Sequence, residues 1–185
     1  YTYNKLGDND AMNLNNGRNA YGRGTWASCI RYHNNTFYVS SFSSTTGKTY
    51  IWSTKDIEKG QWNEISFSPS LHDHTLWFDD DGRVYMIYGN KRLILVELKP
   101  DLTGIKEGGL NQVVIENSSL PSGTDSGLGE GSQLFRYNGK LYLFNITWPK
   151  GGMRSVVVHR ADKITGPWEG KLVFQDKGVA QGGMV

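Results

Sequence analysis

The sequence predicts an all-β fold, and within that class a β-propeller of which residues 1–185 hold about three blades. Its composition favours strands and turns, with 23 Gly, 10 Tyr and 6 Trp. Two-residue hairpin turns recur before apolar runs, at Asn34-Asn35, Asp81-Gly82 and Asn138-Gly139. The pattern around these turns repeats, and a four-strand repeat of roughly 40–50 residues is typical of a propeller blade.

The repeat is clearest from the tyrosines that follow each turn by three residues: Tyr38, Tyr85 and Tyr142. Twelve residues before each of them stand, in order, Trp26, Asp73 and Glu130. In a propeller the first strands of all blades line the central axis and run in the same direction. We therefore expect this aromatic ring and these two carboxyl groups around one mouth of the channel, a combination suited to sugar chemistry.

The first blade is predicted at residues 26–67, with strands at 26–33, 36–42, 49–54 and 62–67. Trp26 opens the innermost strand. A core position is the commoner fate of a strand Trp, but its place at the mouth favours a sugar-stacking surface. Arg31 and His33 lie near a turn and are expected to be solvated.

The second blade is predicted at residues 71–117 and contains His72-Asp73-His74. Strand alternation would put both histidines on the face opposite Asp73. Two histidines without a third ligand make a weak metal site, so ordinary polar roles are favoured and no metal ligand is assigned. The run Asp79-Asp80-Asp81-Gly82 does not match a calcium loop, and a type I′ turn explains it better.

The third blade is predicted at residues 128–176, and residues 178–185 look like the opening of a further blade. Glu130 stands among glycines; without a following Gly-Lys-Ser/Thr or a helix, these do not form a phosphate cradle. A solvated turn glutamate is the alternative for Glu130 taken alone. Arg154 is either a surface charge or a donor to sugar hydroxyls in the pocket. Because the chain stops in mid-strand, we expect it to be part of a longer protein.

Composition excludes several classes of function. The net charge is +2 and no large basic cluster is present, so nucleic acid is not an expected partner. The single Cys29 rules out an internal disulfide framework and a cysteine metal site. No apolar run has the length of a membrane span, so no membrane partner is expected.

Several short segments, in this order and spacing, resemble one known family. They are YGRGTWA at 21–27, His72-Asp73, FDDDGRVY at 78–85, Gly129-Glu130-Gly131, TGPW at 165–168 and AQGG at 180–183. The chain is similar to the middle of a glycoside hydrolase family 43 catalytic domain, a five-bladed β-propeller found in β-xylosidases, α-L-arabinofuranosidases and arabinanases. Many members carry Pro where this chain has Ser28, His74 and Ser132, so the resemblance identifies the family more firmly than the substrate.

The resemblance implies roles for the two carboxyl groups. Glu130 matches the family's general acid, and Asp73 matches the carboxylate that orients the acid and modulates its pKa. The residues alone would name Asp73 the base and Glu130 the acid, because hydrolysis of a glycosidic bond needs such a pair. The family places its general base on the first blade, and residues 1–24 contain no matching strand-borne aspartate. We therefore expect the base, the first blade and most of the fifth to lie outside this chain, in missing parts of the same polypeptide.

The predicted function is an inverting glycosidase that acts on xylosyl or arabinosyl linkages of plant polysaccharide fragments, with an oligosaccharide as its partner. This chain alone is expected to be incomplete and inactive. No cofactor is required, although the resemblance allows a calcium or other ion on the propeller axis. The alternative is a carbohydrate-binding or scaffolding propeller without catalysis. Substrate contacts are expected from Trp26, His72, Trp77, Arg154 and Gln181.

Overall fold

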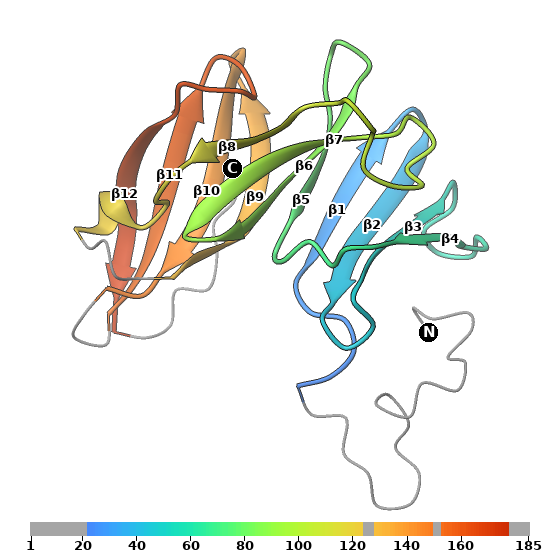
Figure 1. Ribbon diagram of the computed structural model, residues 1–185, viewed down its shortest axis with the longest axis horizontal. Coiled ribbons are helices and arrows are strands. Elements are labelled where there is room, and N and C mark those ends of the chain that lie inside the picture. The colour runs from blue at the N-terminus through green and yellow to red at the C-terminus, as the bar shows by residue number, and fades with distance from the viewer. Residues whose placement is uncertain (1–21, 124–127, 150–152, 178–185) are drawn as a thin grey trace, which may run out of the picture.

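The protein is seen in a computed structural model that describes residues 22–123, 128–149 and 153–177. The predicted opening of a further blade at 178–185, including Gln181, lies outside the described residues. Within them, twelve strands form three four-stranded antiparallel sheets that follow one another along the chain (Figure 1). This arrangement confirms the all-β, propeller-like fold predicted from the repeat.

Each sheet is a simple meander in which neighbours in sequence are neighbours in space. The first sheet consists of β1 (Ser28–His33), β2 (Thr36–Ser43), β3 (Lys48–Thr54) and β4 (Asn63–Phe67). The second consists of β5 (Thr75–Phe78), β6 (Val84–Asn90), β7 (Arg92–Leu98) and β8 (Asn111–Ile115). The third consists of β9 (Gly129–Tyr137), β10 (Lys140–Thr147), β11 (Arg154–Ala161) and β12 (Glu169–Asp176). A short 3-10 helix, η2 (Leu120–Ser122), follows β8.

Two-residue hairpin turns are predicted between the first two strands of each sheet, and two of the three have that geometry. Asn34 and Asn35 both have positive φ, as do Asn138 and Gly139, which is the type I′ geometry. At the aspartate-rich turn only Gly82 has positive φ, and its amide donates to Asp79 O at 3.0 Å. The type I′ prediction is therefore wrong there. A longer loop with a left-handed glycine closes this hairpin.

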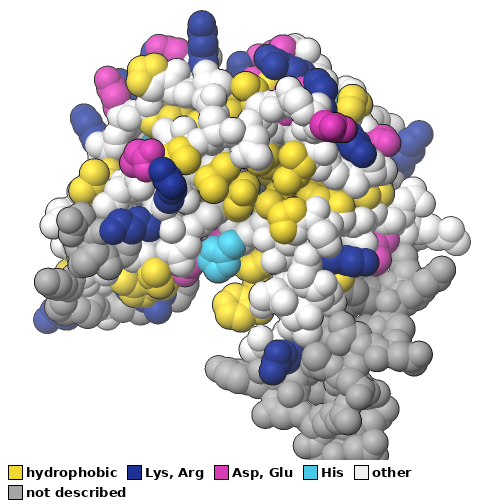
Figure 2. All heavy atoms as spheres, viewed as in Figure 1, with side chains coloured by type: hydrophobic (Ala, Val, Ile, Leu, Met, Phe, Trp, Pro, Cys, Tyr) yellow, Lys and Arg dark blue, Asp and Glu magenta, His cyan; other side chains and the backbone are white. Residues whose placement is uncertain are grey.

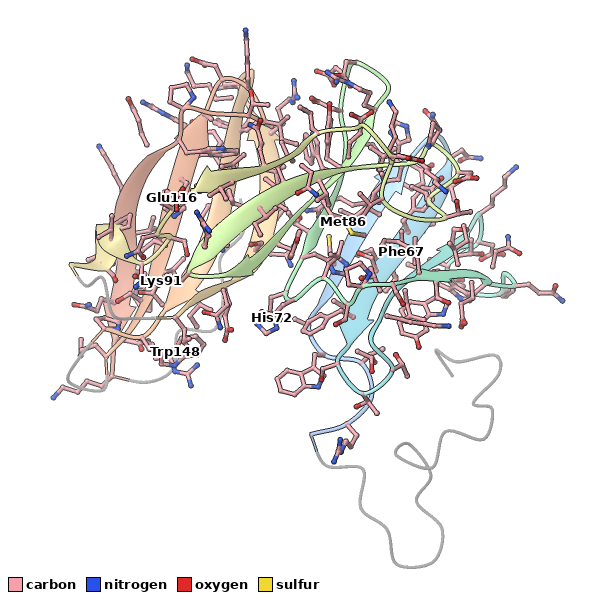
Figure 3. All side chains as sticks on the ribbon, viewed as in Figure 1. Phe67, His72, Met86, Lys91, Glu116 and Trp148 are labelled. Carbon is pink, nitrogen blue, oxygen red and sulfur yellow. The ribbon has the colours of Figure 1, made fainter. Side chains whose placement is uncertain are left out.

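The hydrophobic core lies between the sheets in two clusters. One joins the first and second sheets and includes Phe67 and Met86, which Figure 3 labels. The other joins the second and third sheets and includes Leu95, Leu134 and Leu143, all fully buried. Because each sheet packs on the next through side chains of alternating strand positions, the inner strands β1, β5 and β9 are held in a fixed relation.

Arg31 ties these three inner strands together. Its Nε donates to Leu76 O at 2.8 Å, and its Nη2 donates to Thr75 Oγ1 at 2.6 Å and to Leu134 O at 2.9 Å. The guanidinium also lies over the Phe135 ring, 5.6 Å from its centroid. The prediction of a solvated Arg31 is wrong, because a long side chain on the innermost strand points toward its neighbours across the channel. His33 likewise stacks on a ring, that of Phe78, with centroids 4.4 Å apart.

Candidate active site

The turn before β5 and the start of β9 lie side by side and carry the two candidate catalytic carboxyl groups. Main-chain hydrogen bonds hold this contact: the amide of Ser132 donates to Asp73 O at 3.2 Å, and the amide of Gly89 donates to His72 O at 2.9 Å. Residues 72–73 are thereby fixed to both β6 and β9. These main-chain hydrogen bonds therefore fix the backbone from which the Asp73 and Glu130 side chains project, whatever rotamers those side chains adopt.

Asp73 has a left-handed backbone conformation, with φ of 47°. Aspartate is one of the few residues besides glycine that adopts this region readily. As a result β5 begins only at Thr75, and residues 72–74 do not alternate as strand residues do. The Nε2 atom of His72 lies 3.9 Å from Oδ2 of Asp73. The prediction that His72 faces away from Asp73 is therefore wrong.

His74 goes to a separate environment. Its ring nitrogens lie 2.9 Å from Leu71 O and 2.9 Å from Ser40 Oγ, and the residue is buried. Burial lowers the pKa of His74 to about 4, so the ring is neutral at ordinary pH. The two histidines of the run thus divide into one at the site and one in the core.

A β-bulge directs Glu130. The register between β9 and β10 shifts between Phe144 and Ile146, and Gly131 has φ of 68° within the bulge. Asn145, fully buried, closes the gap by donating to Ser132 Oγ at 3.0 Å and to Glu130 O at 3.4 Å. Bulges commonly re-aim a side chain next to a functional site. Here the bulge places Glu130 beside the 72–73 turn.

The Glu130 carboxylate is held at one oxygen. His72 Nε2 lies 3.0 Å from Oε2, and Asn90 Nδ2 donates to the same oxygen at 3.1 Å. The side chain is 18% exposed, so it is sheltered but reachable. Asn90, at the end of β6, was not predicted as a site residue. The one hint to it in the sequence was its place at a strand end on the same side of the blade as Asp73.

The Asp73 carboxylate is more enclosed. The amide of Gly131 donates to its Oδ2 at 3.1 Å, and the side chain is 11% exposed. Burial raises the pKa of Asp73, and the nearby Glu130 charge raises it further, while His72 and the Gly131 amide oppose the rise. The hydrogen bond with Glu130 raises the pKa of His72. The charges of these neighbouring groups therefore act on one another across the site.

An aromatic row leads from these groups to the surface. The His72 ring meets Phe42 edge-on at 5.0 Å, and Trp26 lies 6.3 Å beyond Phe42. Trp26 precedes β1 by two residues and is 50% exposed, whereas Phe42 is buried. Trp26 thus offers a ring face near the mouth, as a stacking surface would, and Phe42 is a neighbour that the sequence did not single out.

Two further predicted substrate contacts, Trp77 and Arg154, have partners outside the cluster of His72, Asp73 and Glu130. Trp77 packs against the core of the second and third sheets, its Nε1 donates to Asp79 Oδ1 at 3.2 Å, and Arg136 covers its ring. Arg154 stacks on Trp148 with its guanidinium 4.6 Å from the ring centroid. Strand alternation alone could not distinguish Trp77 and Arg154 from the residues at the cluster, because the direction of each side chain depends on bulges and turns.

The surface around His72 is hollowed. Figure 2 shows a notch at the lower edge of the molecule with a histidine (cyan) at its rim and hydrophobic side chains beside it. Figure 3 labels His72 at the corresponding place, with Trp148 across the notch. The His72 side chain is 37% exposed, so solvent and small ligands reach it.

Two sets of atoms bear on metal binding. The ligand atoms of His72, Asp73 and Glu130 all lie within 4.8 Å of one another and could hold an ion. Beneath the mouth, oxygens of Thr75, Leu76 and Leu134 accept hydrogen bonds from Arg31. The axial ion stays a prediction.

The model of the family described as glycosyl hydrolases family 43 matches residues 4–179. The chain belongs to this family. The cluster of Asp73 and Glu130 is thus found in a family 43 protein, at the turn before β5 and the start of β9. In the described residues no helix is long and apolar enough to cross a membrane.

Family 43 relatives resemble the chain over most of its length. A bifunctional GH43-CE protein of Bacteroides eggerthii has a solved structure that is 59% identical, with a TM-score of 0.92, over 99% of this chain and 24% of that one. Xylosidase/arabinosidase 43B of Humicola insolens is 30% identical over 79% of this chain and 29% of that protein. A beta-xylosidase of Formosa agariphila is 23% identical over 90% of this chain and 32% of that protein. The chain therefore spans about a quarter to a third of these relatives.

Proposed function

We propose that this chain supplies the general acid, and the carboxylate that positions it, to a glycosidase that cleaves xylosyl or arabinosyl linkages with inversion. The observation that carries the proposal is the cluster of Glu130 with Asp73 and His72 at the mouth of the inner strands. The names of the relatives, xylosidase/arabinosidase and beta-xylosidase, support this substrate class. Nothing in these names favours a propeller that only binds carbohydrate.

Glu130 is the acid in this proposal. Both donors that hold it contact Oε2, which leaves Oε1 to carry the proton and deliver it to the leaving oxygen of the glycoside. Trp26 offers a ring face on which the sugar stacks. The base that activates water comes from another part of the polypeptide.

Asp73 is the positioning carboxylate and not the base. An inverting acid and base stand roughly 6.5–9.5 Å apart to admit sugar and water, whereas the ligand atoms of Asp73 and Glu130 lie within 4.8 Å. A retaining pair is closer, about 5–5.5 Å, but it still needs the sugar ring between the two groups. Here the His72 ring nitrogen occupies that space, 3.0 Å from one carboxylate and 3.9 Å from the other.

The test is Glu130→Gln in the complete polypeptide, assayed on aryl β-xylosides and aryl α-L-arabinofuranosides with a range of leaving groups. Loss of the acid should lower kcat/KM about 10²–10⁴-fold for poor leaving groups and little for activated ones. Glu116→Gln, at an exposed ion pair with Arg92, is the matched control and should keep full activity. An equal loss for all leaving groups would remove Glu130 from the role of acid. The anomeric configuration of the first product, followed by NMR, tests inversion.

A further inference from the structure

We infer that His72, Asp73 and Glu130 form a binding site for a transition-metal ion of the Zn²⁺ type, and that such an ion blocks the site. The three ligand atoms, one imidazole nitrogen and two carboxylate oxygens, lie within 4.8 Å of one another. The ion binding stands on this geometry by itself. Its inhibitory effect rests on the proposed function of Glu130.

The separations suit an ion of this size. Zn²⁺ binds nitrogen and carboxylate oxygen at about 2.0–2.2 Å, so two ligand atoms at a tetrahedral angle stand about 3.4 Å apart. His72 Nε2 lies 3.0 Å from Glu130 Oε2 and 3.9 Å from Asp73 Oδ2, values on either side of that spacing. The Asp73 and Glu130 ligand atoms lie within 4.8 Å of each other, so side-chain rotation must draw the three atoms around one ion.

The groups that orient the ligands are already in place. Asn90 Nδ2 donates to Glu130 Oε2, and the amide of Gly131 donates to Asp73 Oδ2. Hydrogen bonds of this kind around ligating carboxylates fix their direction and typically matter 10–100-fold in metal affinity. The backbone also contributes, because the left-handed Asp73 turns its carboxylate to the same side as His72.

The chemistry of the ligand set selects the ion. A neutral imidazole with two carboxylates suits Zn²⁺, Co²⁺ or Ni²⁺, whereas Ca²⁺ seeks six to eight oxygens and Mg²⁺ an octahedron of oxygens. Three protein ligands leave at least one position for water, as open zinc sites do. His72 is 37% exposed, so an ion from solvent reaches the site.

Binding competes directly with acid catalysis. The ion takes the lone pair of His72 Nε2 and one oxygen from each carboxylate, and any proton on His72 Nε2 or on either oxygen of the two carboxyl groups passes to solvent. The hydrogen bond between His72 and Glu130 is replaced by two bonds to the ion. Glu130 then has no proton to give to a leaving group, and a sugar cannot approach it.

The experiment is calorimetric titration of the complete protein with Zn²⁺ alone in a non-chelating buffer. We expect one saturable site per chain, which Ca²⁺ and Mg²⁺ do not displace. His72→Gln and Glu130→Gln should each weaken it at least 10-fold, with thermal melts to show that both variants are folded. The matched control is His33→Gln, whose ring stacks on Phe78 away from both carboxylates and whose loss should leave the affinity unchanged.

A second readout connects binding to activity. Zn²⁺ should inhibit turnover over the same concentration range in which it binds, and a chelator should restore the rate. No saturable site, or a site that His72→Gln leaves within two-fold, would overturn the inference while the glycosidase proposal stands. Zn²⁺ binding at these residues in a protein without glycosidase activity would instead overturn the proposed function alone.

Discussion

At the residue scale, Asp73 both shapes the backbone before β5 and contributes a carboxylate to the site. Its left-handed φ of 47° ends the alternation of the chain just before β5, and its carboxylate then accepts from Gly131. The same turn sends His72 to the mouth and His74 into the core. One residue thus decides which of three adjacent polar side chains take part in the site.

Replacing Asp73 in two ways separates these tasks. Asp73→Asn keeps an acceptor for Gly131 and a residue that tolerates the left-handed region, so stability should change little. Asp73→Ala adds about 1–2 kcal/mol of strain and also loses the hydrogen bond. In urea denaturation, the free energy of unfolding of Asp73→Ala should therefore be roughly 2 kcal/mol lower than that of Asp73→Asn. Both variants should lose most activity. Equal stabilities would mean that the left-handed turn is not maintained.

A buried histidine outside the site makes a prediction about pH. His159 is 3% exposed, its Nε2 lies 3.3 Å from Ser118 O, and burial lowers its pKa to about 4. Because the folded pKa lies below the unfolded value of about 6.5, the unfolded state binds a proton first as the pH falls. Stability should drop by on the order of 3 kcal/mol between pH 6.5 and pH 4 through this group.

The variant His159→Gln isolates that contribution. Its free energy of unfolding, measured in urea, should fall less steeply than that of the natural protein over the same pH range. At pH 7.5 the His159 ring is neutral in both the folded and the unfolded state. The difference in free energy of unfolding between the two proteins at that pH therefore measures only the packing cost of the substitution. Parallel pH curves for the two proteins would contradict the assignment.

At the scale of the elements, two devices position the site: the bulge in β9 and the side chain of Arg31. The bulge aims Glu130 toward the turn before β5. Arg31, from β1, donates to backbone or hydroxyl oxygens on β5 and β9. Neither device belongs to the catalytic cluster, yet both fix the distance between the strands that carry it.

Arg31→Lys should therefore destabilise the fold. A lysine cannot reproduce three hydrogen bonds from one planar fork, so buried acceptors lose their donors at a cost of about 2–3 kcal/mol. Arg92→Lys is the matched control, because its exposed ion pair with Glu116 contributes at most about 1 kcal/mol. Chemical denaturation of both variants checks the difference. A loss no larger than that of the control would show that Arg31 does not join the sheets.

At the scale of the whole molecule, the first and third sheets expose large apolar side chains. Ile30 and Tyr32 on β1 are 54% and 61% exposed, and Leu172, Val173 and Phe174 on β12 are 43% to 56% exposed. Exposed patches of this kind mark surfaces that other protein covers. We propose that further parts of the same polypeptide cover them, since the relatives are three to four times the length of the matched region.

Residues 1–185 produced alone should therefore associate in solution and fail to hydrolyse aryl β-xylosides or α-L-arabinofuranosides. Light scattering after size-exclusion chromatography reports the first property, and a sensitive aryl glycoside assay the second. The complete polypeptide, purified in the same way, is the control and should be active. A monomeric isolated chain with turnover comparable to that control would refute the proposal that base and cavity wall come from elsewhere.

The sequence by itself determined the all-β class, the division into three four-stranded units and the pairing of Asp73 with Glu130. These follow from local rules, because turn residues and period-2 patterns act over a few positions and a repeat places equivalent residues equivalently. Only the tertiary structure decided the place of His72, Asn90 and Arg31. A left-handed residue, a bulge and a long side chain change directions between strands that are far apart in sequence, and no local pattern records where such side chains meet.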